Sequence, residues 1–217
     1  MKRLAGYLFY SDPQPERALR SFLKKLFMCF LRGSRVCHVA LAGGRTPLEL
    51  YRMLSSEKLP WDRLRFYLSD ERYVPQGSEF SNYSSVKRAL GERSRLAFFK
   101  TEMSPEECAL DYTLQLPERL HVALLGVGGD GHTASLFPGV DCQDISPKVC
   151  LSRSPDGLLR LSLTEEYLNH SCVVLFFLKG EEKRKVLESM IKGEGLPACR
   201  VKGRLRTYIF TDLPWKV

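Results

Sequence analysis

Apolar residues recur every three or four positions in one long segment near the start of the chain, and this spacing predicts a helix with one buried face. The apolar positions are Leu19, Phe22, Leu23, Leu26, Phe27 and Phe30. Pro15 suits the first turn of this helix, and Gly33 suits its end. The next apolar segment, residues 36–41, is short and leads into the glycine-containing residues 42–47, after which residues 48–54 are again helical in pattern. The order strand, glycine loop, helix is typical of α/β proteins.

The same alternation of short apolar segments and amphipathic segments continues along the chain. Strands are predicted over residues 65–68, 122–125, 158–163, 173–178 and 208–211, and helices over residues 82–90, 105–116 and 182–191. Strands that alternate with helices favour a mostly parallel sheet with helices on both faces, a Rossmann-like α/β fold. Ligands in such folds bind beyond the carboxyl ends of the strands. Because no linker, repeat or low-complexity tract divides residues 1–217, we expect a single domain.

The composition is that of a globular domain, since 44% of the 217 residues are hydrophobic and 27% are charged. The net charge is +8, and residues 179–217 contribute +5 of it, from ten Lys and Arg against five Asp and Glu. A basic field favours anionic partners. Nucleic acid, an acidic membrane surface and a phosphorylated small molecule all fit this description, and charge alone does not choose among them.

Seven cysteines are scattered through the chain, and none belongs to a Cys-x-x-Cys pair. They are Cys29, Cys37, Cys108, Cys142, Cys150, Cys172 and Cys199. An odd number, mostly in apolar segments, is typical of structural thiols in a reducing compartment. The apolar runs at residues 4–10 and 26–31 are too short for a signal-peptide core or a bilayer span. We therefore expect a soluble cytoplasmic protein with no membrane partner.

The first of three loops with candidate chemistry is Gly43-Gly44-Arg45-Thr46-Pro47, which follows a predicted strand and opens a helix. Paired glycines let backbone N–H groups approach an anion, and the helix N-terminus adds partial positive charge. This pattern predicts a site for phosphate or a similar oxyanion. The same residues also fit a tight turn with Thr46 as the helix N-cap and Pro47 at the first helical position, which needs no ligand.

The second loop, Ser69-Asp70-Glu71-Arg72-Tyr73-Val74-Pro75, places two carboxylates and a guanidinium at the end of a predicted strand. The Arg72 guanidinium is suited to a two-pronged hydrogen bond with phosphate or carboxylate. The alternative is a solvated charge cluster, or an internal Asp–Arg pair that holds the loop. Asn82, ten residues after Arg72, is either a helix cap or a ligand contact.

The third loop, residues 126–138, reads Gly-Val-Gly-Gly-Asp-Gly-His-Thr-Ala-Ser-Leu-Phe-Pro and carries the strongest signal. Four glycines hold Asp130 and His132 in an exposed loop. Histidine exchanges a proton readily near neutral pH, and a carboxylate two residues away can orient it and raise its basicity. We therefore predict that His132 acts in proton transfer. The other three histidines lie in a strand or at the edges of elements.

Residues 126–131 also satisfy Gly-x-Gly-x-x-Gly, the pattern of dinucleotide-binding loops. Such loops need an acidic residue at a strand end about twenty residues later, and residues 144–149 place none there. Asp130 and His132 would also crowd the pyrophosphate, so we interpret the match as accidental. No His or Cys pair has the spacing of a metal site, and no Gly-x-Ser-x-Gly motif supplies a nucleophilic serine. General-base hydrolysis or proton shuttling remains.

In this order and with these residues, the three loops resemble the 6-phosphogluconolactonase family, a branch of the fold shared with glucosamine-6-phosphate deaminases. Members typically read Ser-Gly-Gly-Ser-Thr-Pro, then Asp-Glu-Arg-x-Val-Pro followed by Ser-Asn-Tyr, then Gly-x-Gly-x-Asp-Gly-His-Thr-Ala-Ser-Leu-Phe-Pro. The chain is similar to these patterns at residues 43–47, 70–75, 81–83 and 126–138. Residues 160–164 and 180–183 are similar to the family's Arg-x-Thr-x-Thr and Gly-x-x-Lys segments.

The resemblance implies hydrolysis of 6-phospho-D-glucono-1,5-lactone to 6-phosphogluconate, a step of the oxidative pentose phosphate pathway, with no cofactor and no metal. It implies that His132 takes a proton from water for attack on the lactone carbonyl and that Asp130 orients His132. The implied substrate and phosphate contacts are Gly43, Gly44, Arg45, Thr46, Asp70, Arg72, Asn82, Gly131, Arg160 and Lys183. Ala42 and Arg45 depart from the family pattern by replacing serines, so Arg45 either substitutes a charge for a hydroxyl or points outward.

Two other functions fit parts of the pattern. A deaminase or isomerase of amino-sugar phosphates resembles the chain in fold, but those enzymes read Asp-Glu-Tyr in the second loop and carry a glutamate five residues after the histidine. Arg72 and Phe137 stand at those positions here, so the proton relay for ring opening is incomplete. A sugar-phosphate-binding regulator would need a DNA-recognition module, and residues 1–35 offer one helix rather than a helix-turn-helix.

The basic side chains of residues 200–206 occupy every second position, a spacing typical of one face of an exposed strand. This segment is the part of the chain best suited to weak, salt-sensitive contact with nucleic acid. We nevertheless expect a monomer that binds a small sugar-phosphate lactone and no nucleic acid.

Overall fold

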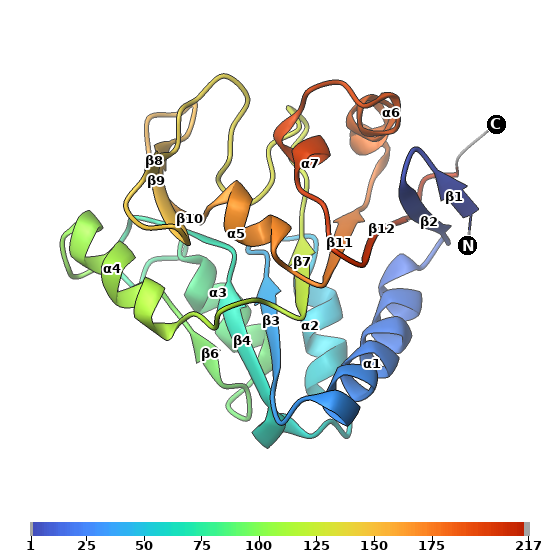
Figure 1. The fold of residues 1–217 in the computed structure, drawn as a ribbon, viewed down its shortest axis with the longest axis horizontal. Coiled ribbons are helices and arrows are strands. Elements are labelled where there is room, and N and C mark those ends of the chain that lie inside the picture. The colour runs from blue at the N-terminus through green and yellow to red at the C-terminus, as the bar shows by residue number, and fades with distance from the viewer. Residues whose placement is uncertain (1, 215–217) are drawn as a thin grey trace.

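An eight-stranded sheet forms the centre of the computed structural model, which describes residues 2–214. Its strand order is β1-β2-β12-β11-β7-β3-β4-β6 (Figure 1). The strands are β1 (Lys2–Leu4), β2 (Tyr7–Ser11), β3 (Cys37–Leu41), β4 (Leu64–Leu68), β6 (Leu96–Ala97), β7 (Val122–Leu125), β11 (Val173–Leu178) and β12 (Arg206–Thr211). Neighbouring strands run parallel except in the β1–β2 hairpin. The mostly parallel sheet expected from the sequence is confirmed.

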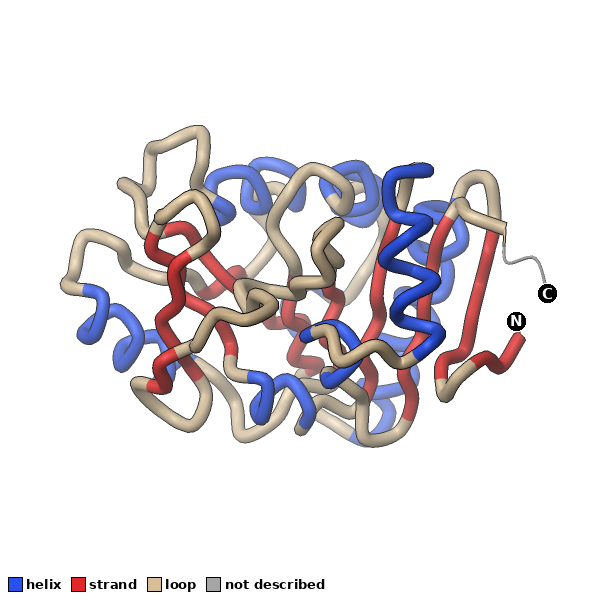
Figure 2. Tube along the Cα trace, turned by 90° about the horizontal axis from the view of Figure 1, so that it is seen from above, coloured by secondary structure: helices blue, strands red, loops and turns tan. Residues whose placement is uncertain are grey.

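Helices lie on both sides of the row of strands when the molecule is viewed from above (Figure 2). They are α1 (Pro15–Gly33), α2 (Leu48–Ser55), α3 (Asn82–Leu90), α4 (Pro105–Gln115), α5 (Glu165–Asn169), α6 (Arg184–Lys192) and α7 (Pro197–Arg200), with 3-10 helices η1 (Trp61–Arg63) and η2 (Glu181–Lys183). The helices predicted after the first two loops and before β7 agree with α2, α3 and α4 to within one residue.

Helix α1 shows how the apolar pattern produces burial. Leu19, Leu23, Phe27 and Leu31 follow at four-residue spacing, and all four are buried. Pro15 is the first residue of the helix, where a missing N–H costs no hydrogen bond. Removal of this apolar stripe from water is the main force that docks an amphipathic helix on a sheet.

The central strands end at the same level. Leu41 of β3 pairs with Leu68 of β4 and with Leu124 of β7. Leu125 of β7 pairs with Phe176 of β11. The loops that follow these four strands are therefore brought to one edge of the sheet, and three of them are the loops that carry the motifs.

A second sheet, antiparallel and ordered β5-β10-β9-β8, is not predicted by the sequence pattern. Its strands are β5 (Asp70–Arg72), β8 (Gln143–Asp144), β9 (Val149–Arg153) and β10 (Leu159–Leu163). The segment predicted as a strand over residues 158–163 belongs to this sheet. Residues 70–72 were expected as a loop, because Asp-Glu-Arg has no apolar alternation, but they pair with β10.

Several shorter elements also differ from the predictions. The β1–β2 hairpin, α5 and α7 were not predicted, because segments of three to five residues show no measurable period. The helix predicted from residue 182 begins as the 3-10 turn η2 before α6. Residues 200–206 do not form one face of a strand, since α7 ends at Arg200 and β12 begins at Arg206.

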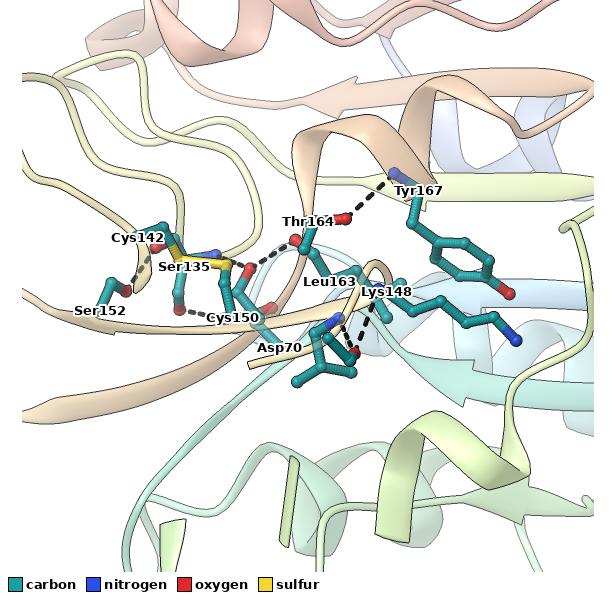
Figure 3. Close-up of a disulfide and its surroundings, with 12 residues drawn as sticks. Asp70, Ser135, Cys142, Lys148, Cys150, Ser152, Leu163, Thr164 and Tyr167 are labelled. Carbon is teal, nitrogen blue, oxygen red and sulfur yellow. Dashed lines mark hydrogen bonds between the residues drawn. A yellow bond between two sulfur atoms is a disulfide. The ribbon is translucent and has the colours of Figure 1, made fainter. Parts of the chain in front are cut away.

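The cysteine expectation is wrong for one pair, because Cys142 and Cys150 form a disulfide (Figure 3). Cys150 lies in β9, and Cys142 lies just before β8. The other five cysteines, all within the described residues, are free. The spacing of eight residues carries no recognisable signature, so this pairing depends on the fold. No helix between residues 2 and 214 is both long and apolar enough to cross a membrane.

Candidate active site

A cavity of about 450 Å³ lies at the carboxyl ends of β3, β7 and β11. Its walls carry the side chains of five cations and one histidine, and Asp70 is the one carboxylate among its described lining residues. The cations are Arg45, Arg72, Arg160, Lys179 and Lys183. A concave, cation-lined site at the end of parallel strands suits an anionic small molecule.

The structure gathers ten of the twelve predicted site residues around this cavity. They are Gly43, Gly44, Arg45, Thr46, Asp70, Arg72, Asn82, His132, Arg160 and Lys183. Asp130 lies behind His132 rather than on the cavity wall. Gly131 also lies behind the wall, where its carbonyl accepts a hydrogen bond from the Ala198 amide and a Cβ would sit 2.8 Å from Leu196.

The first loop leaves its backbone amides unpaired. No acceptor within residues 2–214 bonds the amides of residues 43–46. The turn with Thr46 as helix N-cap is not what forms, because α2 starts at Leu48 after Pro47 and has no side-chain cap. A Cβ on Gly43 would overlap the Asn82 amide, so glycine is required there. Successive unpaired amides ahead of a helix form an anion-binding concavity.

In the second motif, Glu71 has a structural role, whereas Asp70 and Arg72 line the cavity. Glu71 is buried and accepts hydrogen bonds from the amides of Arg72, Asn82 and Tyr83 at 2.7–2.8 Å. Burial raises the pKa of the Glu71 carboxyl, and these amide bonds limit the rise. Glu71 therefore fixes the start of α3.

Asn82 is not the helix cap, since the Ser81 hydroxyl accepts from the Ser84 amide and caps α3. The Asn82 amide group donates to the Asp70 carbonyl at 3.0 Å and lines the cavity. Its side chain thus links the second motif to the glycine of the first, and it lies where a ligand contact was expected.

Arg72 and Arg160 face each other across the β5–β10 ladder. Arg72 donates to the Phe80 carbonyl at 2.7 Å, and Arg160 donates to the Ser154 hydroxyl at 3.2 Å. Burial and the Arg72 charge lower the pKa of the Arg160 guanidinium, against the opposing effect of Asp70. The internal Asp–Arg pair considered for this loop is absent from the ion pairs of the described chain. Two like charges held together favour an anion between them.

The β7 loop holds the predicted base against its carboxylate. The His132 Nδ1 lies 2.6 Å from Asp130 Oδ1, and the His132 amide donates to the same oxygen at 3.1 Å. Partial burial raises the pKa of the Asp130 carboxyl, but the hydrogen bonds from the amide and ring of His132, with the ring's charge, outweigh this and lower it. An ionised Asp130 keeps the proton on Nδ1 and leaves Nε2 as the free basic nitrogen.

Local backbone geometry explains the glycines of this loop. The Gly128 amide donates to the His132 carbonyl at 2.8 Å, and a Cβ on Gly128 would overlap the imidazole. Phe137 packs against the imidazole, with ring centroids 4.8 Å apart. Residues 126–148 contain no helix, so the Gly-x-Gly-x-x-Gly segment does not lead into a helix as a dinucleotide-binding loop does. This agrees with the interpretation of the match as accidental.

Lys179 and several lining residues were missed by the sequence argument. Lys179 follows β11, and its Nζ lies 2.9 Å from Glu16 Oε1 at the start of α1. The hydrogen bond with Glu16 raises the pKa of Lys179. Its position at the carboxyl end of a predicted strand was the available signal. Ser135 was also missed, although it belongs to the third motif. The residues that the structure describes contain no group of three or more His, Cys, Asp or Glu arranged to hold a metal ion.

Residues 14–209 match the family described as glucosamine-6-phosphate isomerases/6-phosphogluconolactonase. The chain belongs to this family. It is 36% identical to the 6-phosphogluconolactonase of Thermotoga maritima, over 79% of this chain and 82% of that protein. It is 34% identical to the 6-phosphogluconolactonase of Treponema pallidum, over 80% of each chain. These relatives confirm the resemblance to 6-phosphogluconolactonases inferred from the motifs.

The fold is shared with the solved structures of the family. The crystal structure of the Thermotoga maritima 6-phosphogluconolactonase superimposes with a TM-score of 0.83 and 31% identity, covering 94% of this chain and 98% of that one. The α/β class expected from the alternation of strands and helices is therefore confirmed.

Proposed function

We propose that the cavity hydrolyses 6-phospho-D-glucono-1,5-lactone to 6-phosphogluconate, the lactonase step of the oxidative pentose phosphate pathway. The relatives named 6-phosphogluconolactonase support this reaction. The observation that carries the proposal is that His132, on the wall of a cavity lined by five cations, lies 2.6 Å from the Asp130 carboxylate behind it. A base with a fixed tautomer beside an anion site suits hydrolysis of a phosphorylated substrate.

The phosphate binds against the unpaired amides of residues 43–46, with Arg72, Arg160 and Lys183 as its cationic partners. Within residues 2–214, neither the Arg45 guanidinium nor the Lys183 ammonium forms a hydrogen bond or ion pair, so both charged groups are free to meet the substrate. Thr46 and Asn82 add polar contacts from the same wall. Contacts at the non-reacting phosphate hold the lactone ring in place for attack.

The reaction begins when His132 Nε2 takes a proton from water and the hydroxide forms a bond to the lactone carbonyl carbon. The tetrahedral intermediate then breaks its bond to the ring oxygen, which receives the proton from the imidazolium. Asp130 stabilises the imidazolium between the two proton transfers. The product is the open-chain acid, water is the only reagent consumed, and the imidazole is regenerated.

Phe137 favours hydrolysis over sugar-ring isomerisation. It lines the cavity beside His132 at the position where the deaminases carry a glutamate. An aromatic ring there supplies no proton for ring opening.

The experiment follows the loss of freshly prepared 6-phosphogluconolactone above its spontaneous rate, with a parallel assay for ammonia released from glucosamine 6-phosphate. We expect saturable lactone hydrolysis and no ammonia. Ammonia release without lactone hydrolysis would reverse the assignment, and no acceleration of either reaction would refute an enzymatic role for the cavity.

A further inference from the structure

We infer that Ser135 is a positioning residue for the base, and that Asp70 acts through it rather than on the substrate. The inference rests on the proposed function, because it assigns a role in placing His132. Ser135 lies three residues after His132, on the segment that carries the chain from the central sheet to the small sheet.

Every polar group of Ser135 is bonded to the small sheet. Its hydroxyl donates to Asp70 Oδ2 at 2.8 Å, and its amide donates to the Ser162 hydroxyl at 3.1 Å. Its carbonyl accepts from the Ser152 hydroxyl at 2.7 Å. The three partners lie in β5, β10 and β9, so a single residue is tied to three different strands. Figure 3 shows Ser135 and Ser152 beside the disulfide that joins β9 to the preceding loop.

Both carboxyl oxygens of Asp70 already accept a hydrogen bond within the protein. Asp70 is 9% exposed, Oδ1 accepts from the Ser69 hydroxyl at 2.8 Å, and Oδ2 accepts from Ser135. Ser135 itself is 1% exposed. A hydrogen bond between two groups that are shielded from water is stronger than the same bond in solvent. The bond therefore fixes the β7 loop to the end of the second motif.

The loop needs such an anchor because its backbone is strained between the base and Ser135. Ala134 has φ of +49°, a left-handed conformation that is unfavourable for an L-residue other than glycine. Thr133 holds the near side of this residue, since its hydroxyl donates to the Gly126 carbonyl at 2.9 Å. Ser135 holds the chain after Ala134. Loss of the Ser135 hydrogen bond lets residue 134 relax and moves the imidazole from its place beside Asp130.

The test compares Ser135→Ala with Ser171→Ala. Ser171 is an equally buried serine at the opposite end of the sheet, and its hydroxyl has no partner among the described groups. We expect Ser135→Ala to lower kcat by about 10- to 100-fold with KM within about twofold, because small displacements of a catalytic group cost rate rather than affinity. Hydrogen exchange of the peptide covering residues 132–136 should rise in Ser135→Ala and not in Ser171→Ala. The Ser171→Ala variant should keep the wild-type kcat.

A second arm tests the route through Asp70. If Asp70 acts through Ser135, the variant Asp70→Asn and the double variant with Ser135→Ala should have about the same kcat as Ser135→Ala. Multiplied losses in the double variant would show that Asp70 acts independently and would overturn this part. Ser152→Ala, which removes one donor only, gives a smaller loss of about 2- to 10-fold and serves if Ser135→Ala does not fold.

Failure of this inference is distinct from failure of the proposed function. If the wild-type protein is active and Ser135→Ala has the same activity and the same hydrogen exchange, the positioning role alone is overturned. A wild-type protein without lactonase activity refutes the function, and the hydrogen-exchange comparison then still decides whether Ser135 holds the loop.

Discussion

Asp130 and His132 are two residues apart in a loop that glycines shape. Gly128 leaves room for the imidazole, and its amide bonds to the His132 carbonyl, so the ring rests against the carboxylate instead of turning into solvent. Contacts between residues this close in sequence depend on local spacing, which is why the pair was predicted. Ser135 lies in the same motif, but its three partners are far away in sequence, and spacing gave no indication of them.

Removal of one member of the arginine pair separates substrate binding from chemistry. Arg160→Ala should raise KM for the lactone by about 10- to 100-fold, the size expected for a lost charge-assisted hydrogen bond, with kcat within about threefold. Arg153→Ala is the matched control, because Arg153 is exposed on the neighbouring strand and does not line the cavity. A Michaelis–Menten comparison of the two variants checks this. An unchanged KM in Arg160→Ala would remove Arg160 from the phosphate site.

Helices and strands could be predicted from the sequence where their apolar residues recur with a regular period. Helices α1 and α3 and strands β7 and β11 are long or regular enough to be placed within a few residues. Strand β5 consists of three charged residues and exists because β10 pairs with it, so no local pattern marks it. The small sheet is therefore a product of tertiary pairing.

The disulfide should stabilise this sheet. Because it closes a loop of eight residues, Cys142→Ser should lower the free energy of unfolding by roughly 2 to 3 kcal/mol under non-reducing conditions. Cys29→Ser is the control, since Cys29 is exposed and free. Urea unfolding with and without a thiol reductant measures both. Equal stability of the two variants without reductant would show that the bond does not stabilise the fold.

At the scale of the whole molecule, the site depends on strand order. Lys179 reaches the cavity only because β11 is placed next to β7, and the sequence does not state that order. The motif residues were found from their local patterns, and they meet in the structure because all four central strands end at one edge of the sheet. Lys179 directly precedes the Gly-x-x-Lys segment of residues 180–183 but is not part of it, so only its position at a strand end could have indicated it.

The opposite end of the sheet gives the molecule a pH response. His38 and His121 stack there, and the His121 ring accepts a hydrogen bond from the His38 amide at 3.0 Å. Burial lowers the pKa of both, with further lowering of His38 by the charges of His121 and Arg65 and of His121 by Arg119.

The unfolded chain takes up these protons at about pH 6.5, before the folded protein does. Stability is therefore full above that pH and falls as the pH drops through the unfolded-state value toward the lower folded-state values. Urea unfolding at pH 7.5 and pH 5.5 should show a loss that is smaller in His38→Gln. The same loss in this variant and in the wild type would exclude His38 as a source.

If His132 is the general base, its removal must slow the hydrolysis far more than the removal of any other histidine. Initial rates of lactone hydrolysis are measured at neutral pH for the wild-type protein, His132→Ala and the control His170→Ala, which changes an exposed histidine outside the cavity. We expect His132→Ala to lose about 10²- to 10⁴-fold in kcat, the usual contribution of general acid–base catalysis, while His170→Ala keeps full activity. A His132→Ala rate within about threefold of wild type would contradict it.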